Sequence, residues 1–483
     1  MNKNARRTVL LSLSAGLLAS TLAACTKTGS GDGKSERVLR IATNDYVNEN
    51  EYFREQFTEL FEFANPNIKL EFVSTLDERF RYSGSSDPNE KPKDPIDKLS
   101  ELMTGVNPPD VVLIDYDHLP ELVSNNLLKQ LDQDIAKDKF DTSDIAPPII
   151  EGIKRAGDGK IYALAPTFDS YALIYNKKLF DEAGVPYPAD KMTWDQTFDL
   201  ARRLSKGEGE NRKFGFAFST YSSRSSNLNY AMRVYTEPLQ LRMFDDNAEK
   251  MTVDSDQWEK VWKTLLQLKA EKLVPQPSDD LKGRGSGPNE DHPFQDDDFL
   301  SGRVAMSLIH YRDVESVANV MKNAHNFKGL TPFDWDVVTI PVHPETPENG
   351  YGVRLDGLMG ISARAQNTED AWKFIKFINS EEWARLKGSS SSSLMARQKY
   401  IKPKDGAEFN IKAFTTLLPA PDVEDKLYRK LPNLYQVRTI GNRKLQDVSV
   451  NNLQVREALK QWQSEGDALL LKMKENPNAS VDH

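Results

Sequence analysis

Residues 38–43 read VLRIAT, residues 68–73 read IKLEFV and residues 110–114 read DVVLI. Each run is short and rich in apolar or β-branched residues, a pattern that predicts a strand. Apolar residues recur with helical spacing over 53–64, and a second helix is predicted over 95–103. Strands that alternate with helices along the chain predict an α/β fold, in which helices flank a mostly parallel sheet.

The same alternation resumes later in the chain. A strand is predicted over 171–175 and a helix over 177–183, which Gly184 would end because glycine accepts a left-handed backbone. Thr193 and Gln196 have the spacing of a capping box, which predicts the start of another helix. Stripes of tryptophan and phenylalanine further along are interpreted as helix faces that pack into the core.

The amino-terminal end is typical of a secreted lipoprotein. Residues 1–24 contain basic residues, then an apolar run, then small residues, which is the order of a secretory signal. The sole cysteine, Cys25, follows Leu22-Ala23-Ala24, an ending that resembles a bacterial lipobox. We therefore expect 1–24 to be a lipoprotein signal peptide, Cys25 to be lipidated and 25–37 to be a flexible tether. The protein would be extracytoplasmic and lipid-anchored to the bacterial cell membrane. An uncleaved membrane anchor is the alternative.

The amino-acid composition indicates which kinds of partner the protein can bind. Lysines and arginines number 63 against 72 aspartates and glutamates, which gives a net charge of −9. An acidic surface repels phosphate backbones, so nucleic acid is not expected as a partner. Hydrophobic residues make up 39% of the chain and charged residues 28%, which fits a soluble globular body. With its only cysteine lipidated, the folded part would contain no disulfide and no cysteine-bound metal.

The motifs of common hydrolases and nucleotide-binding enzymes do not occur in the sequence. There is no His-Glu-x-x-His, no Gly-x-Ser-x-Gly, no phosphate-binding loop and no Gly-x-Gly-x-x-Gly. The six histidines lack metal-ligand spacing, and the run 296–298 of aspartates is expected to be a solvated acidic face. We expect no catalytic residue, no metal site and no cofactor. A carboxylate pair for glycoside cleavage stays an open alternative among 72 acids.

Several blocks of the sequence carry a family resemblance. Residues 159–164 read GKIYAL and are followed by DSYALIYNK at 169–177. Residues 299–306 read FLSGRVAM, residues 371–377 read AWKFIKF, and PDVV occupies 109–112. In this order the blocks resemble the family 1 extracellular solute-binding proteins, which are the capture subunits of ABC importers and include maltose-binding protein.

The resemblance implies a two-lobed periplasmic-binding-protein-like fold of type II. Each lobe would be an α/β unit, and the chain would cross three times between them. The implied crossings lie near Asp169–Ile174, Trp335–Pro341 and Gly357–Ser362. Lobe one would then comprise residues 38–168 plus 341–357, and lobe two residues 169–340 plus 358–483.

The resemblance also implies a function without catalysis. A small solute, expected to be a sugar or oligosaccharide, would bind between the lobes, close them by hinge bending and be delivered to ABC permease subunits. We expect a monomer that is not an enzyme. Two alternatives stay open, namely a solute sensor that feeds a signalling partner and a secreted carbohydrate-active hydrolase.

Candidate ligand-binding residues follow from strand ends and from matched positions. Open α/β sheets bind ligands beyond the carboxyl ends of their strands. Carboxylates accept hydrogen bonds from sugar hydroxyls, and tyrosine rings pack on the apolar faces of sugars. At Asp169 the resemblance implies an acidic sugar contact, and at Tyr311 an aromatic platform. The candidates are Asp45, Tyr46, Asp115, Tyr116, Asp117, Asp169, Tyr221, Tyr311, Arg312, Asp356, Gly357 and Tyr435.

For each candidate the alternative is a helix cap, a turn or a contact between lobes. None of the seven tryptophans falls at a matched position in the cleft. A smaller, acidic or differently shaped saccharide is therefore as well favoured as maltodextrin.

Overall fold

A computed structural model gives the fold of most of the chain. It describes residues 36–44, 51–77, 93–225, 227–276, 293–388, 392–403, 407–451 and 453–476. Residues 38–483 form one compact unit, which contains the architecture below except for Arg37, the first residue of β1. The predicted signal peptide and Cys25 lie outside the described residues. Within the described ranges, no helix is long and apolar enough to cross a membrane.

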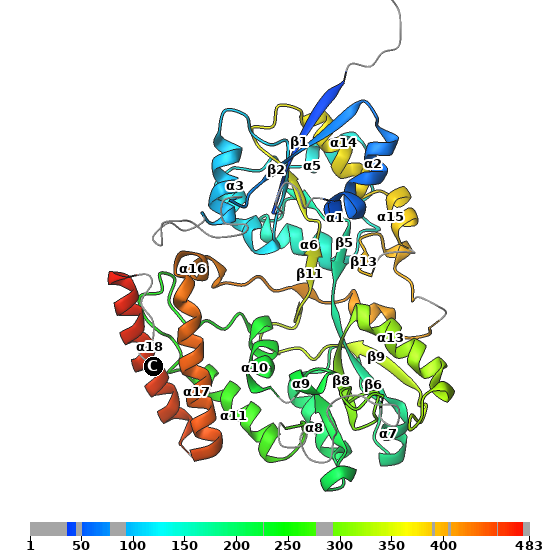
Figure 1. The fold of residues 1–483 in the computed structure, drawn as a ribbon, viewed down its shortest axis with the longest axis vertical. Helices are drawn as coiled ribbons and strands as arrows, with labels where there is room; N and C mark the ends of the chain where they lie inside the picture. Colours follow the sequence, from blue (N-terminus) through cyan, green and yellow to red (C-terminus); the bar gives the residue numbers. More distant parts are fainter. Residues whose placement is uncertain are drawn as a thin grey trace, which may run out of the picture. The chain divides into compact units, whose positions relative to one another are not determined.

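The first sheet has five strands in the order β2-β1-β3-β12-β4. Figure 1 labels two of them, β1 and β2. These strands are β1 Arg37–Thr43, β2 Ile68–Ser74, β3 Val111–Leu113, β4 Ala163–Leu164 and β12 Met359–Ile361. Strands β1 and β3 pair in parallel, whereas β12 runs antiparallel to both β3 and β4. The strands predicted over 38–43, 68–73 and 110–114 are confirmed, and the sheet is mixed rather than mostly parallel.

Helices cover this sheet and close its core. They are α1 Glu51–Phe53, the π-helical turn Arg54–Thr58, α2 Glu59–Ala64, α3 Pro95–Thr104, α4 Leu119–Ser124, α5 Asp132–Lys137, α6 Pro147–Ala156, α14 Thr368–Ile378 and α15 Glu381–Lys387. Phe61 of α2 is fully buried and meets Phe374 of α14 edge-on, with ring centroids 5.0 Å apart. Helices from both ends of the sequence therefore share one core.

This packing corrects the predicted division into lobes. The prediction placed 358–483 in lobe two, but β12 pairs inside the first sheet, and Phe374 and Trp383 belong to its core. The run from β12 to α15 thus belongs with the first sheet, because its apolar residues find their partners there. The predicted crossing near Trp335–Pro341 overlaps β9, which pairs inside the second sheet and ends at Thr339.

The second sheet has four strands in the order β7-β8-β6-β9. They are β6 Tyr171–Asn176, β7 Phe214–Ala217, β8 Val304–His310 and β9 Trp335–Thr339. Strand β6 runs antiparallel to β8 and β9, while β7 and β8 are parallel. With two sheets, each covered by helices, the α/β class is confirmed.

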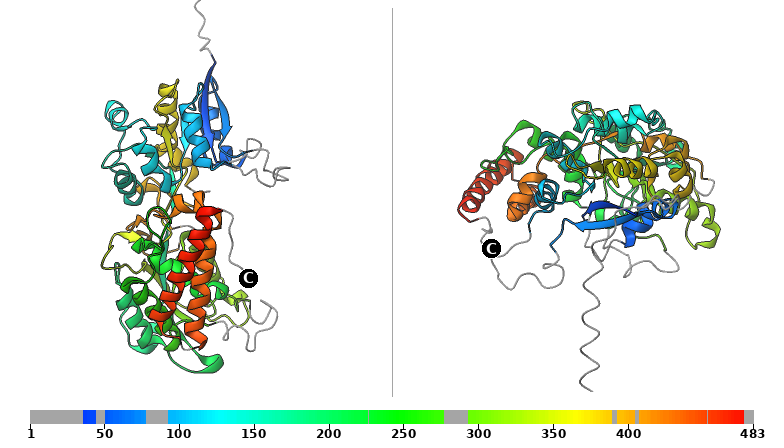
Figure 2. Two further views of the ribbon diagram at one scale, coloured as in Figure 1. Left: turned by 90° about the vertical axis from the view of Figure 1, so that its left-hand side faces the viewer. Right: turned by 90° about the horizontal axis from the view of Figure 1, so that it is seen from above.

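The second sheet has its own helices and core. The helices are α7 Lys177–Ala183, α8 Trp194–Leu204, α9 Ser222–Ser225, α10 Leu228–Thr236, α11 Asp256–Ala270, α13 Tyr311–Lys322, α16 Asp425–Lys430, α17 Tyr435–Asn451 and α18 Val455–Glu475. Figures 1 and 2 show α17 and α18 side by side. Trp262 and Trp462 stack at 5.4 Å in the core, as expected for the aromatic stripes. The Thr193 capping box is confirmed, and Gly184 ends α7 with φ +62°.

The aspartate run at 296–298 differs from the sequence prediction. Asp298 is fully buried and pairs with Arg303, its Oδ1 lying 2.9 Å from the guanidinium. The Asp297 carboxylate accepts backbone N–H groups of Phe299 and Leu300 at 3.0 and 2.8 Å. Burial raises the pKa of Asp297 to about 7. The run therefore shapes a turn before β8 and is not a solvated acidic face.

A small three-stranded sheet, β11-β5-β13, lies where the chain passes between the two larger sheets. It consists of β5 Thr167–Asp169, β11 Arg354–Asp356 and β13 Leu394–Met395, all antiparallel. Strand β5 continues into β6 of the second sheet, and β11 is followed by β12 of the first. Two more short strands, β10 Asn349–Gly350 and β14 Leu418–Pro419, pair in parallel with each other. We call β5 and β11 the hinge strands.

A glycine lies on each side of β11, and a side chain at either position would cause backbone strain and overlap with a neighbouring ring. Gly352 has φ +67°, and a Cβ there would lie 2.7 Å from the ring of Tyr171. Gly357 has φ +64°, and a Cβ there would lie 2.7 Å from the ring of Phe57. Left-handed backbone and close aromatic contact both exclude a larger residue. The predicted ligand residue Gly357 therefore has a clear structural role.

We predict that Gly357→Ala destabilises the protein more than Gly184→Ala does. Both positions have similar positive φ values, but nothing lies within 4 Å of a Cβ at Gly184. Strain alone should make Gly184→Ala cost about 1 kcal/mol, whereas the added overlap with Phe57 should raise the cost of Gly357→Ala to roughly 2–4 kcal/mol. Urea unfolding of the two variants measures the difference, and equal losses would contradict this account.

Candidate ligand-binding site

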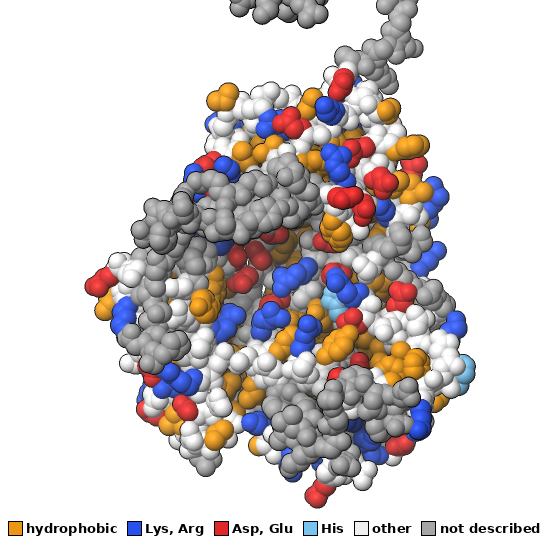
Figure 3. Space-filling view, in the orientation of Figure 1, with side chains coloured by type: hydrophobic (Ala, Val, Ile, Leu, Met, Phe, Trp, Pro, Cys, Tyr) orange, Lys and Arg blue, Asp and Glu red, His pale blue; other side chains and the backbone are white. Residues whose placement is uncertain are grey.

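A hollow opens on the face of the molecule shown in Figure 3, where acidic side chains gather above a group of lysines and arginines. Next to the hinge strands lies a cavity of about 380 Å³. Its lining combines carboxylates, hydroxyls and aromatic rings, which is the chemistry that a polar ligand requires. The lining residues are Tyr52, Glu55, Gln56, Phe57, Glu59, Thr167, Asp356, Trp383, Lys387, Ser392 and Ser393.

Asp169 stands at the end of β5, where the chain enters the second sheet. The β6–β8 register places Tyr171 opposite His310, and α13 begins directly after His310. The Arg312 guanidinium therefore reaches Asp169 and lies 2.8 Å from its Oδ2. His310 Nε2 lies 3.8 Å from the same oxygen, and burial lowers the pKa of His310. The predicted candidates Asp169 and Arg312 are thus brought together.

The second carboxylate oxygen of Asp169 has no partner. Oδ1 is buried and accepts no hydrogen bond within the described part of the structure. A buried carboxylate oxygen without a donor is unfavourable, by about 1–3 kcal/mol in typical cases. This oxygen is therefore available to a donor that approaches when the surrounding groups rearrange.

Asp356 belongs to the same group of charges through the pairing of the hinge strands. In the antiparallel register Asp356 lies opposite Thr167, and Arg354 lies opposite Asp169. The Thr167 hydroxyl approaches Asp356 Oδ2 at 3.5 Å. Enclosure by the surrounding protein and the nearby carboxylate of Asp169 raise the pKa of Asp356. Two acids and two arginines therefore meet at the hinge.

Sequence reasoning missed an aromatic group beside these charges. The ring of Tyr171 packs edge-on against His310 at 4.8 Å and tilts against Tyr351 at 5.3 Å. Arg233 of α10 donates to the Tyr351 hydroxyl at 3.0 Å, and its guanidinium lies over the ring of Tyr230 at 5.6 Å. These residues come from four separate segments. The only signal in the sequence was that Tyr171 follows the matched Asp169.

The three residues of the predicted group 115–117 lie in three different environments. The Tyr116 side chain is buried, and its hydroxyl donates to the Gly152 carbonyl at 2.9 Å, so it supports the core. Asp117 Oδ1 accepts the backbone N–H of Asp422 at 2.9 Å, and burial, with Asp422 close by, raises the pKa of Asp117. The Asp115 side chain is 66% exposed, which leaves its carboxylate accessible.

The remaining candidates lie in different environments. Tyr311 is buried, with its ring edge-on to Phe414 at 5.4 Å, so the structure does not place it as an exposed platform. Tyr221 and Tyr435 are exposed, Tyr221 before α9 and Tyr435 at the start of α17. Asp45 and Tyr46 lie outside the described residues.

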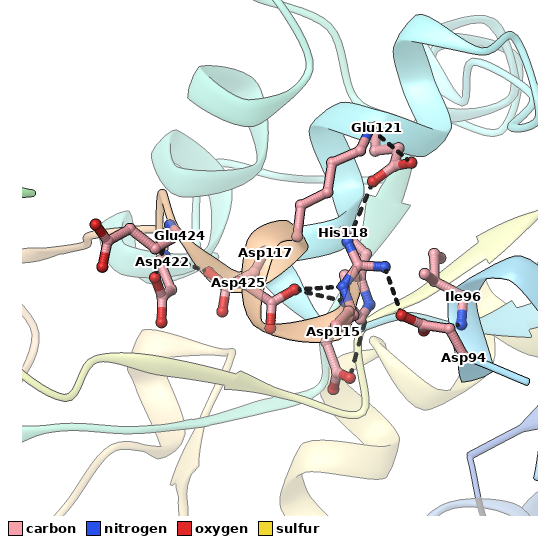
Figure 4. Close-up of polar contacts among 11 residues, drawn as sticks. Asp94, Ile96, Asp115, Asp117, His118, Glu121, Asp422, Glu424 and Asp425 are labelled. Atoms are coloured by element: carbon pink, nitrogen blue, oxygen red, sulfur yellow. Dashed lines mark hydrogen bonds and ion pairs between the residues drawn. The ribbon is translucent and has the colours of Figure 1, made fainter. Parts of the chain in front are cut away.

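An ion-pair network joins the first-sheet region to α16, and Figure 4 shows its members facing one another. Arg429 of α16 lies 3.5 Å from Asp94, 3.3 Å from Glu121 and 2.9 Å from Asp425. Lys426 adds a contact of 3.2 Å with Glu121. We call this group, together with His118, the α16 network.

Helix α16 is held on the other side by the second core. Leu427 belongs to that core, and the ring of Tyr428 packs edge-on against Phe244 at 6.1 Å. Just before the helix, buried Glu424 accepts the backbone N–H groups of Met243 and Phe244. Burial raises the pKa of Glu424 to about 7. The α16 network therefore links the first-sheet region to a helix anchored in the second core.

His118 gives this network a dependence on pH. Its Nε2 lies 3.1 Å from Asp425 Oδ2, and its Nδ1 lies 3.8 Å from Asp115. Burial alone would lower the pKa of His118, but the hydrogen bond to Asp425 and the two nearby carboxylates outweigh it and raise the pKa. The same hydrogen bond lowers the pKa of Asp425. The contact therefore favours protonated His118 beside ionised Asp425.

Together, two helix-covered sheets joined by hinge strands and a polar site beside them define a two-lobed binding protein. The family model described as "Bacterial extracellular solute-binding protein" matches residues 45–385. The chain belongs to this family. A putative binding protein of Brucella abortus (strain 2308) is 24% identical over 471 residues, covering 95% of this chain and 98% of the relative.

Solved structures show the same fold. A sugar transporter from Rhizobium etli in an open conformation has a TM-score of 0.56 at 21% identity, covering 89% of this chain and 99% of that one. The sugar-binding protein MalE from Xanthomonas citri has a TM-score of 0.57 at 16% identity, covering 91% and 98%. The two-lobed type II fold is thereby confirmed.

We predict that His118→Gln loses stability mainly at acidic pH. A raised folded pKa stabilises the protein below the unfolded value of about 6.5, and this contribution disappears as the pH rises through the folded pKa. Urea unfolding should give a difference from the unmodified chain of about 1 kcal/mol near pH 5.5 and much less near pH 8.5. The exposed His325→Gln is the control. An equal loss at both pH values would contradict the charged pair.

Proposed function

We propose that this protein is the extracytoplasmic solute receptor of an ABC importer and that it captures a sugar or oligosaccharide between its lobes. It holds the solute by hinge closure and hands it unchanged to permease subunits, without catalysis. The chain acts as a monomer and is attached to the bacterial membrane through lipid on Cys25. The family membership supports a small-molecule ligand and an importer partner, and the sugar-binding neighbours share the fold.

The observation that carries this proposal is the position of Asp169. Its carboxylate lies at the junction of β5 and β6, and it retains an unsatisfied oxygen beside Arg312. A sugar hydroxyl is a donor of the right kind for that oxygen, and a ligand that contacts both lobes binds the closed form better. The ligand's differential affinity then sets the shift toward closure.

The lobes follow the packing of the chain. In this proposal the first lobe comprises the first sheet with the run from β12 to α15, and the second lobe comprises the second sheet with α16 to α18. The hinge strands absorb the rotation between them. The cavity beside Asp356 and the exposed carboxylate of Asp115 then face the ligand from the first lobe.

We predict that one class of saccharide stabilises the purified protein and that Asp169→Asn removes most of this effect. A ligand that binds only the native state at about 100 times its Kd adds roughly 2.7 kcal/mol of stability. Loss of a charged hydrogen-bond acceptor should weaken binding about 10- to 100-fold. Thermal-shift titrations against a panel of mono- and oligosaccharides measure both effects.

The matched control is Asp199→Asn, because Asp199 is also paired with an arginine but lies on the exposed face of α8. The saccharide affinity of the Asp199→Asn variant should equal that of the unmodified chain. Chromatography of each saccharide after incubation tests for turnover. If no saccharide of the panel stabilises the protein, the result contradicts a saccharide receptor. If a product forms, the result contradicts capture without catalysis.

A further inference from the structure

Two arginines near Tyr171 stand out because neither forms an ion pair within the described residues, although the charge of Glu237 acts on Arg233 from a greater distance. They are Arg224 of α9 and Arg233 of α10, and both are exposed. The other two arginines of this region are engaged: Arg312 with Asp169, and Arg354 with Glu237 at 3.8 Å. In an acidic chain, two unpaired arginines beside a candidate binding site form a distinct local positive charge.

The position of Arg233 is fixed before any ligand arrives. Its guanidinium lies over the rings of Tyr230 at 5.6 Å and Tyr351 at 5.9 Å, and it donates to the Tyr351 hydroxyl at 3.0 Å. That bond uses one of the five N–H donors of an arginine. The other donors belong to a side chain that remains exposed. A preorganised guanidinium loses little freedom on binding a carboxylate.

Arg224 belongs to α9, which precedes α10 and packs against it, and its charge acts on the same aromatic group. Burial raises the pKa of the Tyr171 phenol, and both Arg224 and Arg233 act against that rise. Arg224 has the same effect on Tyr221, whose pKa is also raised by burial. Both guanidinium charges therefore act on one phenol, that of Tyr171, which follows Asp169 by two residues. The ring of Tyr171 is half-buried, and the backbone of Gly352 packs closely against it.

Three carboxylates of this region are held by donors other than these two arginines. Asp169 is held by Arg312, and Asp117 accepts the Asp422 backbone N–H. Glu237 accepts the Gly352 backbone N–H at 3.0 Å and lies near Arg354. These three acids thus already have donors in this conformation, and Arg233 uses only one of its donors for the Tyr351 hydroxyl.

We propose, on the basis of the proposed function, that the ligand is an acidic saccharide whose carboxylate is bound by Arg224 and Arg233. Its sugar ring packs against Tyr171, and its hydroxyls reach Asp169. Arginine recognises a carboxylate through paired N–H···O bonds, which a neutral sugar cannot accept with equal strength. A uronic acid is the simplest saccharide that combines a carboxylate with a ring and hydroxyls.

The test is isothermal titration of the purified chain with oligouronides of two to four residues and with the same compounds after reduction of their carboxyl groups. We expect the oligouronides to bind at least about 10-fold more tightly than their reduced forms. Arg224→Gln and Arg233→Gln should each weaken uronide binding about 10- to 100-fold, and Arg233→Lys should restore part of the loss. Added salt should weaken the uronide complex.

The control is Arg443→Gln, which removes an exposed arginine paired with Glu465 on α18 and should leave binding unchanged. Thermal unfolding of each variant without ligand confirms that it is folded. Equal binding of oligouronides and reduced forms, or full uronide affinity in both glutamine variants, overturns this inference but leaves the saccharide receptor intact. Stabilisation by inorganic phosphate as strong as that by uronides identifies a general anion site and also overturns it. If neither the oligouronides nor their reduced forms bind, this inference fails, and the panel of mono- and oligosaccharides decides separately whether the proposed function fails as well.

Discussion

The pairing of β5 with β11 is the constraint on which the arrangement of the site depends. Strand β5 leads into the second sheet and β11 precedes the first, so one short antiparallel ladder connects both halves. Its register places Arg354 opposite Asp169 and Asp356 opposite Thr167. A slip of one residue would exchange the faces on which these side chains stand. The glycines on either side of β11 hold that register, because only they tolerate the backbone and the neighbouring rings.

The sequence predicted local structure well wherever the signal was itself local. Strand β1, the capping box at Thr193 and the glycine that ends α7 all depend on residues a few positions apart, and all are confirmed. The partner of a short strand is a different matter. Residues 359–361 are apolar and could pair in either sheet. They join the first sheet because their side chains pack into the core that contains Phe374. The division into lobes could not be obtained from periodicity for that reason.

The candidate site shows the same limit. Asp169 and Arg312 were predicted from positions that match the family. Asp169 precedes β6 and Arg312 follows β8, and the antiparallel pairing of these two strands brings the side chains together. Tyr311 also follows a strand end, yet its ring turns into the core, since the first residue of a helix can face either way. Arg233 and Tyr351 lie 118 residues apart, and no local pattern joins them. Their contact exists only because α10 packs beside the segment that precedes β11.

Charge connects the two halves of this molecule in two different ways. In the α16 network each positive group has acidic neighbours, and Arg429 contacts three carboxylates, so its charge is balanced without any ligand. At the hinge the balance differs, since Asp169 retains an unpaired oxygen and Arg233 retains free donors. Satisfied charges contribute rigidity, whereas unsatisfied ones gain free energy only when a partner supplies the missing bonds. A solute that supplies a carboxylate and hydroxyls together would complete both groups at once. The unsatisfied groups lie beside the strands that must bend, so ligand binding and lobe closure can be coupled there.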